Sequence, residues 1–332
     1  MCYLDRMTRL LAQAGKAGDP LGTDWLRRAQ DFLNHGLLLD GFALLEARWD
    51  NPSYAGNRIA DAGSRLCALA DVTGKRVLLW PERGLSDTIL MLRFVPRLAR
   101  FTSAVVLALP PELKRLGASA GVEAVISGGD TFESVDLHCP LMSLPFHLRT
   151  RLLTVPGGAY LSAQPDLVQS WQERLGRTSR LRVGLALGGK ADDAEADMPA
   201  ALLAPLLGRS GVEFHVLRKT VRAADAAVFQ NLPNVHLHSV NLTDLADTAA
   251  LVAGMDLIIS TDTTEAHLAG AIGKPVWVLL GQAAHFAWTT GRQDTPWYPT
   301  ARLFRQPTAG DWTSVAGMLG DALWQRRPNI VL

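Results

Sequence analysis

Polar side chains that could bind a phosphate group follow a buried strand near the C-terminal end of the sequence. The strand at 257–259 is apolar, and Asp262, Thr263 and Thr264 follow it before a helix of small residues that contains His267. A second apolar strand comes after that helix. Open parallel sheets bind ligands at the carboxyl ends of their strands, and a helix N-terminus offers free N–H groups and a positive dipole end. The pattern therefore predicts a nucleotide site at this turn.

Structural roles compete with binding roles at the same turn. Asp262 is followed three residues later by Glu265, which is the spacing of a capping box. His267 lies four residues after Thr263, so both side chains share one helix face near the N-terminus, and we expect that face to look toward the ligand. A lone histidine is more often structural than functional, so the spacing leaves both roles open.

An aspartate at the start of an earlier helix is the candidate catalytic group. Asp87 follows the predicted strand at 76–80, in the segment Glu82-Arg-Gly84-Leu-Ser86-Asp87. Gly84 is expected to permit a tight turn, which places Asp87 in the first turn of the helix. Ser86 or Asp87 capping the helix explains the same spacing, and spacing alone favours capping over catalysis.

Further glycines and basic residues stand at strand ends of the second half. Gly188, Gly189 and Lys190 follow a strand and leave room for a ligand, but they lack the G-x-G-x-x-G spacing of a dinucleotide site. Arg218 and Lys219 end the next strand and could reach a phosphate, although a solvated position is the commoner fate of such charges. His236 and His238 share a strand face without a carboxylate or cysteine partner, which makes a weak metal site.

Length and composition limit the class of protein. The 332 residues suit two domains of ordinary size, and the apolar fraction of 48% is typical of globular proteins. The net charge is +1, from 33 basic and 32 acidic residues, which argues against nucleic-acid binding. Three scattered cysteines indicate no disulfide framework and favour a reducing compartment. No apolar run suits a membrane span or a signal peptide, so we expect a cytoplasmic protein.

Apolar runs of strand length alternate with helical segments from residue 75 onward, which is typical of βαβ units and parallel sheets. A turn cluster and a helix at 167–175, which Gly176 ends, interrupt the alternation. The sequence therefore predicts an α/β protein with two Rossmann-like domains facing a central cleft, the default active site. The expected strands are 76–80, 104–109, 124–126, 135–139, 182–187, 213–217, 235–238, 257–259, 276–280 and 302–304.

Three parts of the chain are expected on this basis. Residues 1–60 carry apolar residues at helical spacing and form a helical, repeat-like segment. Residues 61–165 form the first α/β domain, and residues 166–332 form the second. The helical segment is expected to cap the core; contact with a protein partner or a second copy of the chain is the alternative.

Long motifs recur through most of the chain in the order found in one known family. They occupy residues 41–49, 79–89, 136–145, 244–251, 262–270 and 296–306. With these motifs the chain resembles the bacterial glycosyltransferases that are attached to tetratricopeptide repeats. Those enzymes are related to the lipopolysaccharide heptosyltransferases, or glycosyltransferase family 9, and have the two-domain GT-B fold.

The resemblance implies a nucleotide-sugar donor, a protein or glycan acceptor, and neither a metal nor another cofactor. Asp87 would be the general base that deprotonates the acceptor hydroxyl, which then attacks the anomeric carbon with inversion. Thr263, Thr264 and His267 would hold the diphosphate as it leaves with growing negative charge. The residues expected to bind the donor are Gly188, Gly189, Lys190, Arg218, Lys219, Asp247, Thr248, Asp262, Thr263, Thr264 and His267.

Some positions depart from the family pattern. An acidic stretch at 190–198 replaces a longer basic loop, and its carboxylates would repel a diphosphate unless they point away. Lys190 or Arg218 could supply the missing positive charge. Two interpretations remain: an active transferase with an altered donor pocket, which the sequence favours, or a degenerate protein that binds without transfer. A sugar-nucleotide epimerase of the same fold is a third, which the helical lead and the motif at 296–306 disfavour.

Overall fold

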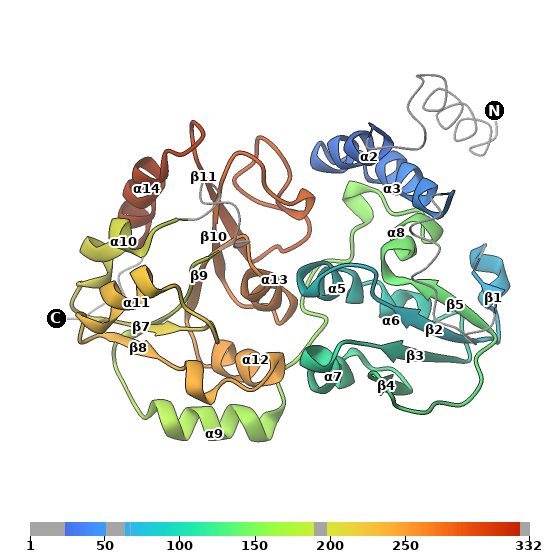
Figure 1. Cartoon of the computed structure of the whole chain (residues 1–332), viewed down its shortest axis with the longest axis horizontal. Coiled ribbons are helices and arrows are strands. Elements are labelled where there is room, and N and C mark those ends of the chain that lie inside the picture. Colours follow the sequence, from blue (N-terminus) through green and yellow to red (C-terminus); the bar gives the residue numbers. More distant parts are fainter. Residues whose placement is uncertain (1–23, 51–63, 67, 189–197, 326–332) are drawn as a thin grey trace. The chain divides into compact units, whose positions relative to one another are not determined.

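The structure, a computed structural model, describes residues 24–50, 64–66, 68–188 and 198–325 of the chain. The chain divides into two compact units (Figure 1). Unit 1 contains Met1–Leu109, Gly121–Pro156 and His285–Gly291, whereas unit 2 contains Pro110–Ala120, Gly157–Ala284 and Arg292–Leu332. Each unit is built on one parallel sheet whose strands are connected by helices. The predicted class, α/β with two parallel sheets, is confirmed.

Unit 1 has a five-stranded parallel sheet in the order β1-β5-β2-β3-β4. Every residue of β2 after Arg76 is apolar and buried, as expected for a parallel strand covered on both faces. The sequence did not predict β1, because its two residues are exposed and carry no apolar pattern. The strands are β1 (Ser64–Arg65), β2 (Arg76–Trp80), β3 (Ala104–Ala108), β4 (Ala124–Ile126) and β5 (Leu137–Pro140).

The helical segment between the predicted strands at 76–80 and 104–109 is interrupted. It forms two helices, α5 (Leu85–Leu92) and α6 (Val95–Leu98). Pro96 lies in the first turn of α6, where its missing N–H is tolerated, but it prevents one helix from continuing through this point. A short helix, α8 (Leu144–His147), follows β5.

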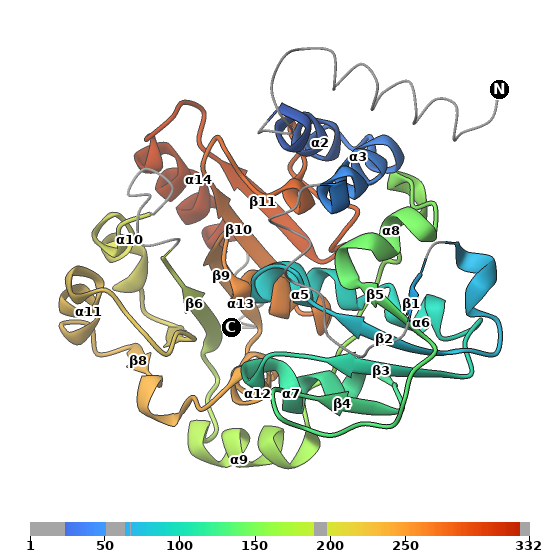
Figure 2. The same ribbon diagram turned by 45° about the vertical axis from the view of Figure 1, so that its right-hand side comes forward.

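Unit 2 has a six-stranded parallel sheet in the order β11-β10-β9-β6-β7-β8, and Figure 2 shows β9, β10 and β11 side by side. Each predicted strand of both units has a counterpart that differs by at most two residues at either end. The strands are β6 (Leu181–Ala186), β7 (Val212–Val216), β8 (Val235–Leu237), β9 (Leu257–Thr261), β10 (Val276–Leu280) and β11 (Ala301–Arg305).

The helices of unit 2 connect these strands. The predicted connecting helix is α9, and Gly176 ends it with a φ of 67°, as the sequence predicted. The helices are α7 (Pro111–Gly117), α9 (Pro165–Leu175), α10 (Ala200–Leu207), α11 (Ala223–Gln230), α12 (Leu245–Ala253), α13 (Thr264–Ala271) and α14 (Trp312–Gln325).

The described part of the N-terminal helical segment belongs to unit 1. It forms α2 (Asp24–Asn34), α3 (Leu38–Leu45) and the 3₁₀ helix η1 (Glu46–Asp50). The ring of Phe42 meets that of Phe286 edge-on at 5.9 Å, and both side chains are fully buried. These helices therefore form part of the unit 1 core rather than a separate layer. Residues 1–23 and 51–60 of the predicted segment lie outside the described residues.

Two segments belong to a different unit from the residues that precede and follow them in the sequence. Helix α7 follows β3 of unit 1 but is part of unit 2, where Arg115 pairs with Asp244 and Asp247 of α12. Residues 285–291 follow β10 of unit 2 but are part of unit 1. The main break between the units comes at Pro156, ahead of the predicted boundary at 165. Arg115 lies 129 and 132 positions from its partners Asp244 and Asp247, and local sequence patterns do not report pairing over such distances.

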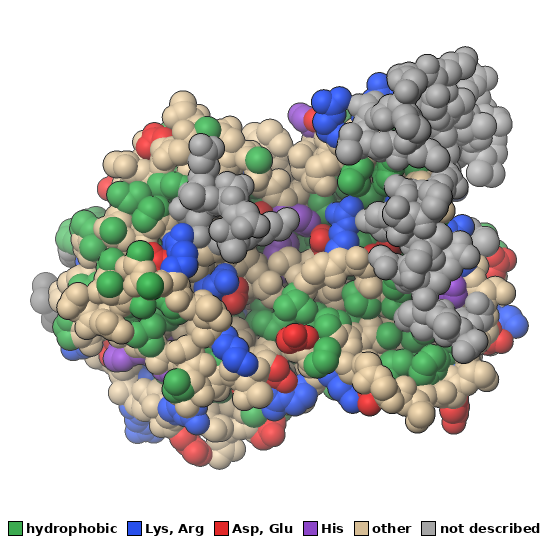
Figure 3. Space-filling model, viewed as in Figure 1, with side chains coloured by type: hydrophobic (Ala, Val, Ile, Leu, Met, Phe, Trp, Pro, Cys, Tyr) green, Lys and Arg blue, Asp and Glu red, His purple; other side chains and the backbone are tan. Residues whose placement is uncertain are grey.

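The surface carries charges of both signs. On the face that Figure 3 shows, the described basic and acidic side chains are interspersed, without a large area of one sign. The described side chains on this face therefore form no continuous basic track for a polyanion. Within the described residues, no helix combines the length and apolar character that crossing a membrane requires.

Candidate functional site

The carboxylate of Asp87 is paired with the imidazole of His285 inside unit 1. His285 Nε2 lies 2.9 Å from Asp87 Oδ1. Asp87 comes from the first turn of α5, and His285 immediately precedes the short 3₁₀ helix η8 (Phe286–Trp288). The exposed fractions of the two side chains are 18% and 21%, so the pair is largely buried but still reaches solvent.

The hydrogen bonds of His285 assign its tautomer. The backbone N–H of Ala287 donates to Nδ1 at 3.2 Å, so Nδ1 is unprotonated and the neutral ring carries its proton on Nε2. The Nε2–H therefore donates to Asp87 Oδ1. A hydrogen bond donated to a carboxylate oxygen favours the ionised form, which is the form that a general base needs. His285 was not predicted from the sequence, because no local pattern marks a residue whose partner lies in an earlier helix.

Gly84, rather than Ser86 or Asp87, is the N-cap residue of α5. Ser86 and Asp87 occupy the second and third helical positions, where a carboxylate is favoured by the positive end of the helix dipole. Gly84 was expected to permit a tight turn, but the conformation found there does not depend on glycine. Its φ of −65° is open to any residue, and a Cβ added there would meet no atom within 4 Å.

Three of the sequence motifs meet in a buried ion-pair network ahead of Asp87. Arg48 donates from Nε and Nη2 to the two carboxylate oxygens of Glu82 at 2.7 and 2.8 Å. It also donates to Glu46 and to Ser143, each at 2.7 Å. Burial alone would lower the pKa of Arg48, but the bonds and charges of Glu82 and Glu46 outweigh burial and raise it. Glu82 lies in the loop between β2 and α5, so this network anchors the loop that leads to Asp87.

In unit 2, the predicted nucleotide turn follows β9 as expected. Thr263 is the N-cap residue of α13, so the expectation that Asp262 caps this helix is wrong. The Thr263 and Ser260 hydroxyls lie 2.9 Å apart, and Thr261 Oγ1 donates to the carbonyl of Gly188 at 2.9 Å. These bonds tie the predicted glycine to the strand that carries the threonines. Gly189 and Lys190 lie outside the described residues, as does most of the acidic stretch.

His267 is fully buried rather than on an open face. Its Nδ1 lies 2.9 Å from the hydroxyl of Tyr298, and its Nε2 lies 3.7 Å from Asp262 Oδ1. Thr263, expected on the same face, has only 5% of its surface exposed. A Cβ on Gly270 would come within 2.2 Å of the Tyr298 ring, so glycine is required there. The ring of His267 therefore supports Asp262 from inside the unit.

Basic residues stand beside this turn. Arg218 Nη1 lies 3.7 Å from Glu265 Oε2, in the first turn of α13, and the Arg218 guanidinium borders Gly188. Lys219 donates to the carbonyl of Thr243 at 3.3 Å. Arg305, at the end of β11, was not among the predicted site residues. Burial lowers the pKa of this guanidinium, and the charge of Asp262 acts in the opposite direction.

Asp247 and Thr248 lie near the start of α12 and form hydrogen bonds there. Asp247 Oδ2 accepts hydrogen bonds from Arg115 Nη2 at 3.0 Å and from the backbone N–H of Thr243 at 3.1 Å. Thr248 Oγ1 donates to the backbone carbonyl of Asp244 at 3.2 Å. Only 9% of the surface of Asp247 and 5% of that of Thr248 are exposed. The hydrogen bonds described for Asp247 and Thr248 thus join them to other residues of unit 2 rather than to a ligand.

A cluster of histidines lies at β7 and β8. His215 Nδ1 is 3.0 Å from His238 Nε2, and the ring of His236 stacks on that of His215 at 5.0 Å. Burial and the neighbouring histidines lower the pKa of His215 to about 3, and burial lowers that of His238 to about 4. In the described part of the chain, no three His, Cys, Asp or Glu side chains are arranged to hold a metal ion.

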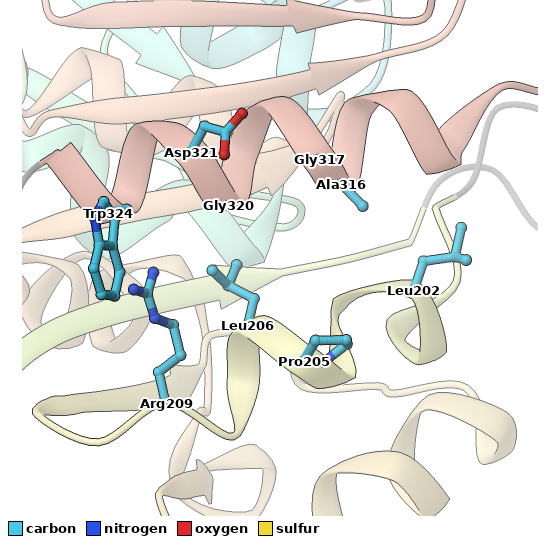
Figure 4. A pocket seen from close by; sticks show the side chains of 9 residues that line it. All are labelled: Leu202, Pro205, Leu206, Arg209, Ala316, Gly317, Gly320, Asp321 and Trp324. Carbon is cyan, nitrogen blue, oxygen red and sulfur yellow. The ribbon is translucent and has the colours of Figure 1, made fainter.

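A pocket of about 430 Å³ lies between α10 and α14 of unit 2. Figure 4 shows Leu206 and Pro205 on α10 facing the backbone of Gly317 and Gly320 on α14, with Arg209 beside Trp324. None of the predicted site residues lines this pocket. Neither Asp87 nor the turn after β9 therefore contributes to its lining.

Comparison with known proteins places this geometry in context. Residues 218–310 match the sequence profile of glycosyltransferase family 9 (heptosyltransferase). The chain is 27% identical over 325 residues to Protein FlbA of Caulobacter vibrioides; the match covers 89% of this chain but 54% of that protein, so the chain spans about half of its relative's length.

Solved structures share the fold at low identity. The glycosyl transferase family 9 structure from Veillonella parvula has a TM-score of 0.57 at 12% identity, covering 78% of this chain and 91% of that one. The ADP-heptose lps heptosyltransferase II of E. coli has a TM-score of 0.52 at 14% identity, covering 76% and 100%. The fold is therefore GT-B, and residues 218–310 carry the sequence signature of glycosyltransferase family 9.

Proposed function

We propose that the protein is an inverting, metal-independent glycosyltransferase that moves a sugar from a nucleotide-sugar donor to a hydroxyl group of a protein or glycan. The observation that carries this proposal is the hydrogen bond from His285 to Asp87, at the start of α5. The family signature of residues 218–310 supports the reaction class. The likeness to heptosyltransferase structures supports the fold on which it would occur.

In this proposal Asp87 accepts the proton of the acceptor hydroxyl as that oxygen attacks the anomeric carbon. The bond between the anomeric carbon and the phosphate oxygen breaks as the new glycosidic bond forms, and the nucleotide leaves as the anion. The hydrogen bond that the imidazole of His285 donates orients the Asp87 carboxylate for this proton transfer. Attack on the face opposite the leaving group inverts the anomeric centre.

The nucleotide is proposed to bind at the turn after β9. Thr263 and Thr264 begin α13, whose free N–H groups and dipole favour a phosphate. Arg218 borders the same turn, and Arg305 lies near enough to Asp262 for their charges to interact. His267, which is fully buried, would act by holding Asp262 and the start of the helix rather than by direct contact with phosphate.

A binding protein without transfer activity is the second candidate. The observation in its favour is Glu265, whose carboxylate stands in the first turn of α13 and 3.7 Å from Arg218. A carboxylate at this position opposes a phosphate at the helix start and neutralises the nearest arginine.

Donor hydrolysis distinguishes the two candidates without a known acceptor, since water replaces the acceptor in a slow side reaction. The nucleotide sugar that binds best in a titration panel is incubated with the protein, and release of nucleotide and free sugar is followed. The transferase predicts release by the wild type and loss of release in Asp87→Asn with unchanged donor binding. Tight binding with no release by either protein would favour the second candidate.

A further inference from the structure

The N-terminal helices contact the neighbours in sequence of both Asp87 and His285. We propose that the segment Asp24–Asp50 positions the Asp87–His285 pair, so that these helices are part of the catalytic apparatus. The inference rests on the proposed function, in which this pair accepts the proton. Two separate connections carry it, one to each partner.

The first connection runs from Arg48 to the loop ahead of Asp87. Arg48 holds both carboxylate oxygens of Glu82, and only 1% and 2% of these two side chains are exposed. Two parallel hydrogen bonds define the plane as well as the distance of a carboxylate. Because breaking a buried ion pair leaves an uncompensated charge, the loop from β2 to α5 cannot shift without a large penalty.

Arg48 is itself held at every donor position. Nε and Nη2 donate to Glu82, Nη2 also to Ser143, and Nη1 to Glu46 and to the carbonyl of Leu45. Ser143 Oγ in turn donates to Glu46 at 2.8 Å. A guanidinium has five N–H donors, and here each has an acceptor. The connection is therefore stiff at both ends.

The second connection runs from α2 and α3 to the segment of His285. The Phe42 ring meets the Phe286 ring at an interplanar angle of 87°, the edge-to-face arrangement that aromatic pairs prefer. The backbone N–H of Thr290 donates to the carbonyl of Asn34 at 3.0 Å. These contacts bracket η8, whose N-cap residue is His285. These contacts hold the segment that carries the imidazole of His285, whereas Arg48 holds the loop that leads to Asp87.

Both connections end within a few residues of Asp87 or His285. Helices that only covered the core of unit 1 would not need hydrogen bonds at these positions. A cover would need only apolar contact, such as that of Phe42. Arg48, whose N–H groups are all hydrogen-bonded, holds the loop that leads to Asp87. A backbone hydrogen bond holds the segment of His285. Both contacts restrict the positions of these segments. The helical segment therefore sets the distance between His285 Nε2 and Asp87 Oδ1.

The test follows the Nε2 proton of His285 by NMR in the full chain. Histidine rings are labelled with ¹⁵N, and His285 is identified among the eight histidines by comparison with the His285→Gln variant. The exchange rate of its Nε2–H with water is measured in the wild type, in Glu82→Gln and in Phe42→Leu. Leu107→Ala in β3, fully buried in the same unit and outside both connections, is the control for lost stability.

The inference predicts slow exchange in the wild type and exchange faster by about tenfold or more in Glu82→Gln and Phe42→Leu, as expected when a hydrogen bond to a charged group is lost. Leu107→Ala, with a similar or larger loss of Tm, should leave the rate unchanged. Slow exchange that persists in both variants overturns the inference while leaving the proposed function intact. Fast exchange in the wild type overturns the inference and removes the observation on which the proposed function depends.

Discussion

His285 Nε2 lies 2.9 Å from Asp87 Oδ1, although 198 positions separate the two residues in the sequence. The contact is possible because residues 285–291 leave the unit of their neighbours and join unit 1. The backbone N–H of Ala287 then selects the tautomer that donates to the carboxylate. A carboxylate and an oriented imidazole are thereby combined at the start of α5, and a carboxylate within reach of an acceptor hydroxyl can act as its general base.

Asp87→Asn is expected to lower the rate of sugar transfer or donor hydrolysis by about 100- to 10,000-fold, the usual contribution of a general base. Asparagine can still accept the hydrogen bond from His285, so the Tm and the affinity for the donor should stay close to those of the wild type. Initial rates, calorimetry and thermal unfolding provide the comparison. A large loss of Tm with an unchanged rate per folded molecule would identify Asp87 as a structural residue.

Two substitutions of His285 separate the effect of its hydrogen bond to Asp87 from the effect of its packing. His285→Leu removes the donor to Asp87, and we expect kcat to fall by about tenfold to a hundredfold, the value of a hydrogen bond to a charged group. In His285→Gln the side-chain amide can donate from nearly the position of Nε2, so most of the rate should return. Equal rates in the two variants would show that the donor has no role in the reaction. The pH profile of kcat/KM should change in His285→Leu and less in His285→Gln.

Gly270→Ala tests the contact between α13 and Tyr298. Its Cβ would come within 2.2 Å of the Tyr298 ring, so we expect a loss of about 1–3 kcal/mol in the free energy of unfolding, as for other overpacked sites. Gly317→Ala in α14 is the matched control, because its Cβ would meet no atom within 4 Å. Helix propensity alone predicts a gain of about 1 kcal/mol there. Urea unfolding of both variants gives the result, and equal effects would contradict the packing described for Tyr298.

The histidine cluster of β7 and β8 predicts a loss of stability in acid. Burial lowers the pKa of His215 to about 3 and that of His238 to about 4, against an ordinary value of 6.5. Between pH 6.5 and 4 the unfolded chain therefore binds protons that the folded chain does not. The free energy of unfolding should fall as the pH falls, by up to about 1.4 kcal/mol per pH unit for each group.

The charged groups that act on this cluster are His236, Arg174 and Arg182, and all disfavour protonation of the buried rings. His215→Phe removes one of the two titrating groups. Its free energy of unfolding should decline less steeply between pH 6.5 and 4.5 than that of the wild type. Parallel declines for the two proteins would exclude His215 as a source of the acid sensitivity.

The predictable features of this protein are those that local patterns encode. The continuous apolar run of β10 (Val276–Leu280) locates that strand to the residue, because a strand buried on both faces has apolar side chains throughout. The apolar residues of β9 (Leu257–Thr261) located that strand as well, although Thr263 caps α13 where Asp262 was expected to. His285 was not predicted, because its partner is fixed by the path of the chain between units rather than by spacing. The sequence also does not reveal that Gly84 has an ordinary φ of −65°, because glycine before a helix is compatible with either sign of φ.

The nucleotide-sugar site on which the proposed function depends is tested most directly by calorimetric titration of the protein with the nucleotides that commonly carry sugars, ADP, UDP, GDP, dTDP and CMP, and with one sugar conjugate of each. Micromolar binding of one nucleotide and its conjugate is the predicted result, and it would also identify the base that the site after β9 accepts. Absence of binding by every member of the panel would contradict a nucleotide-sugar site in this protein.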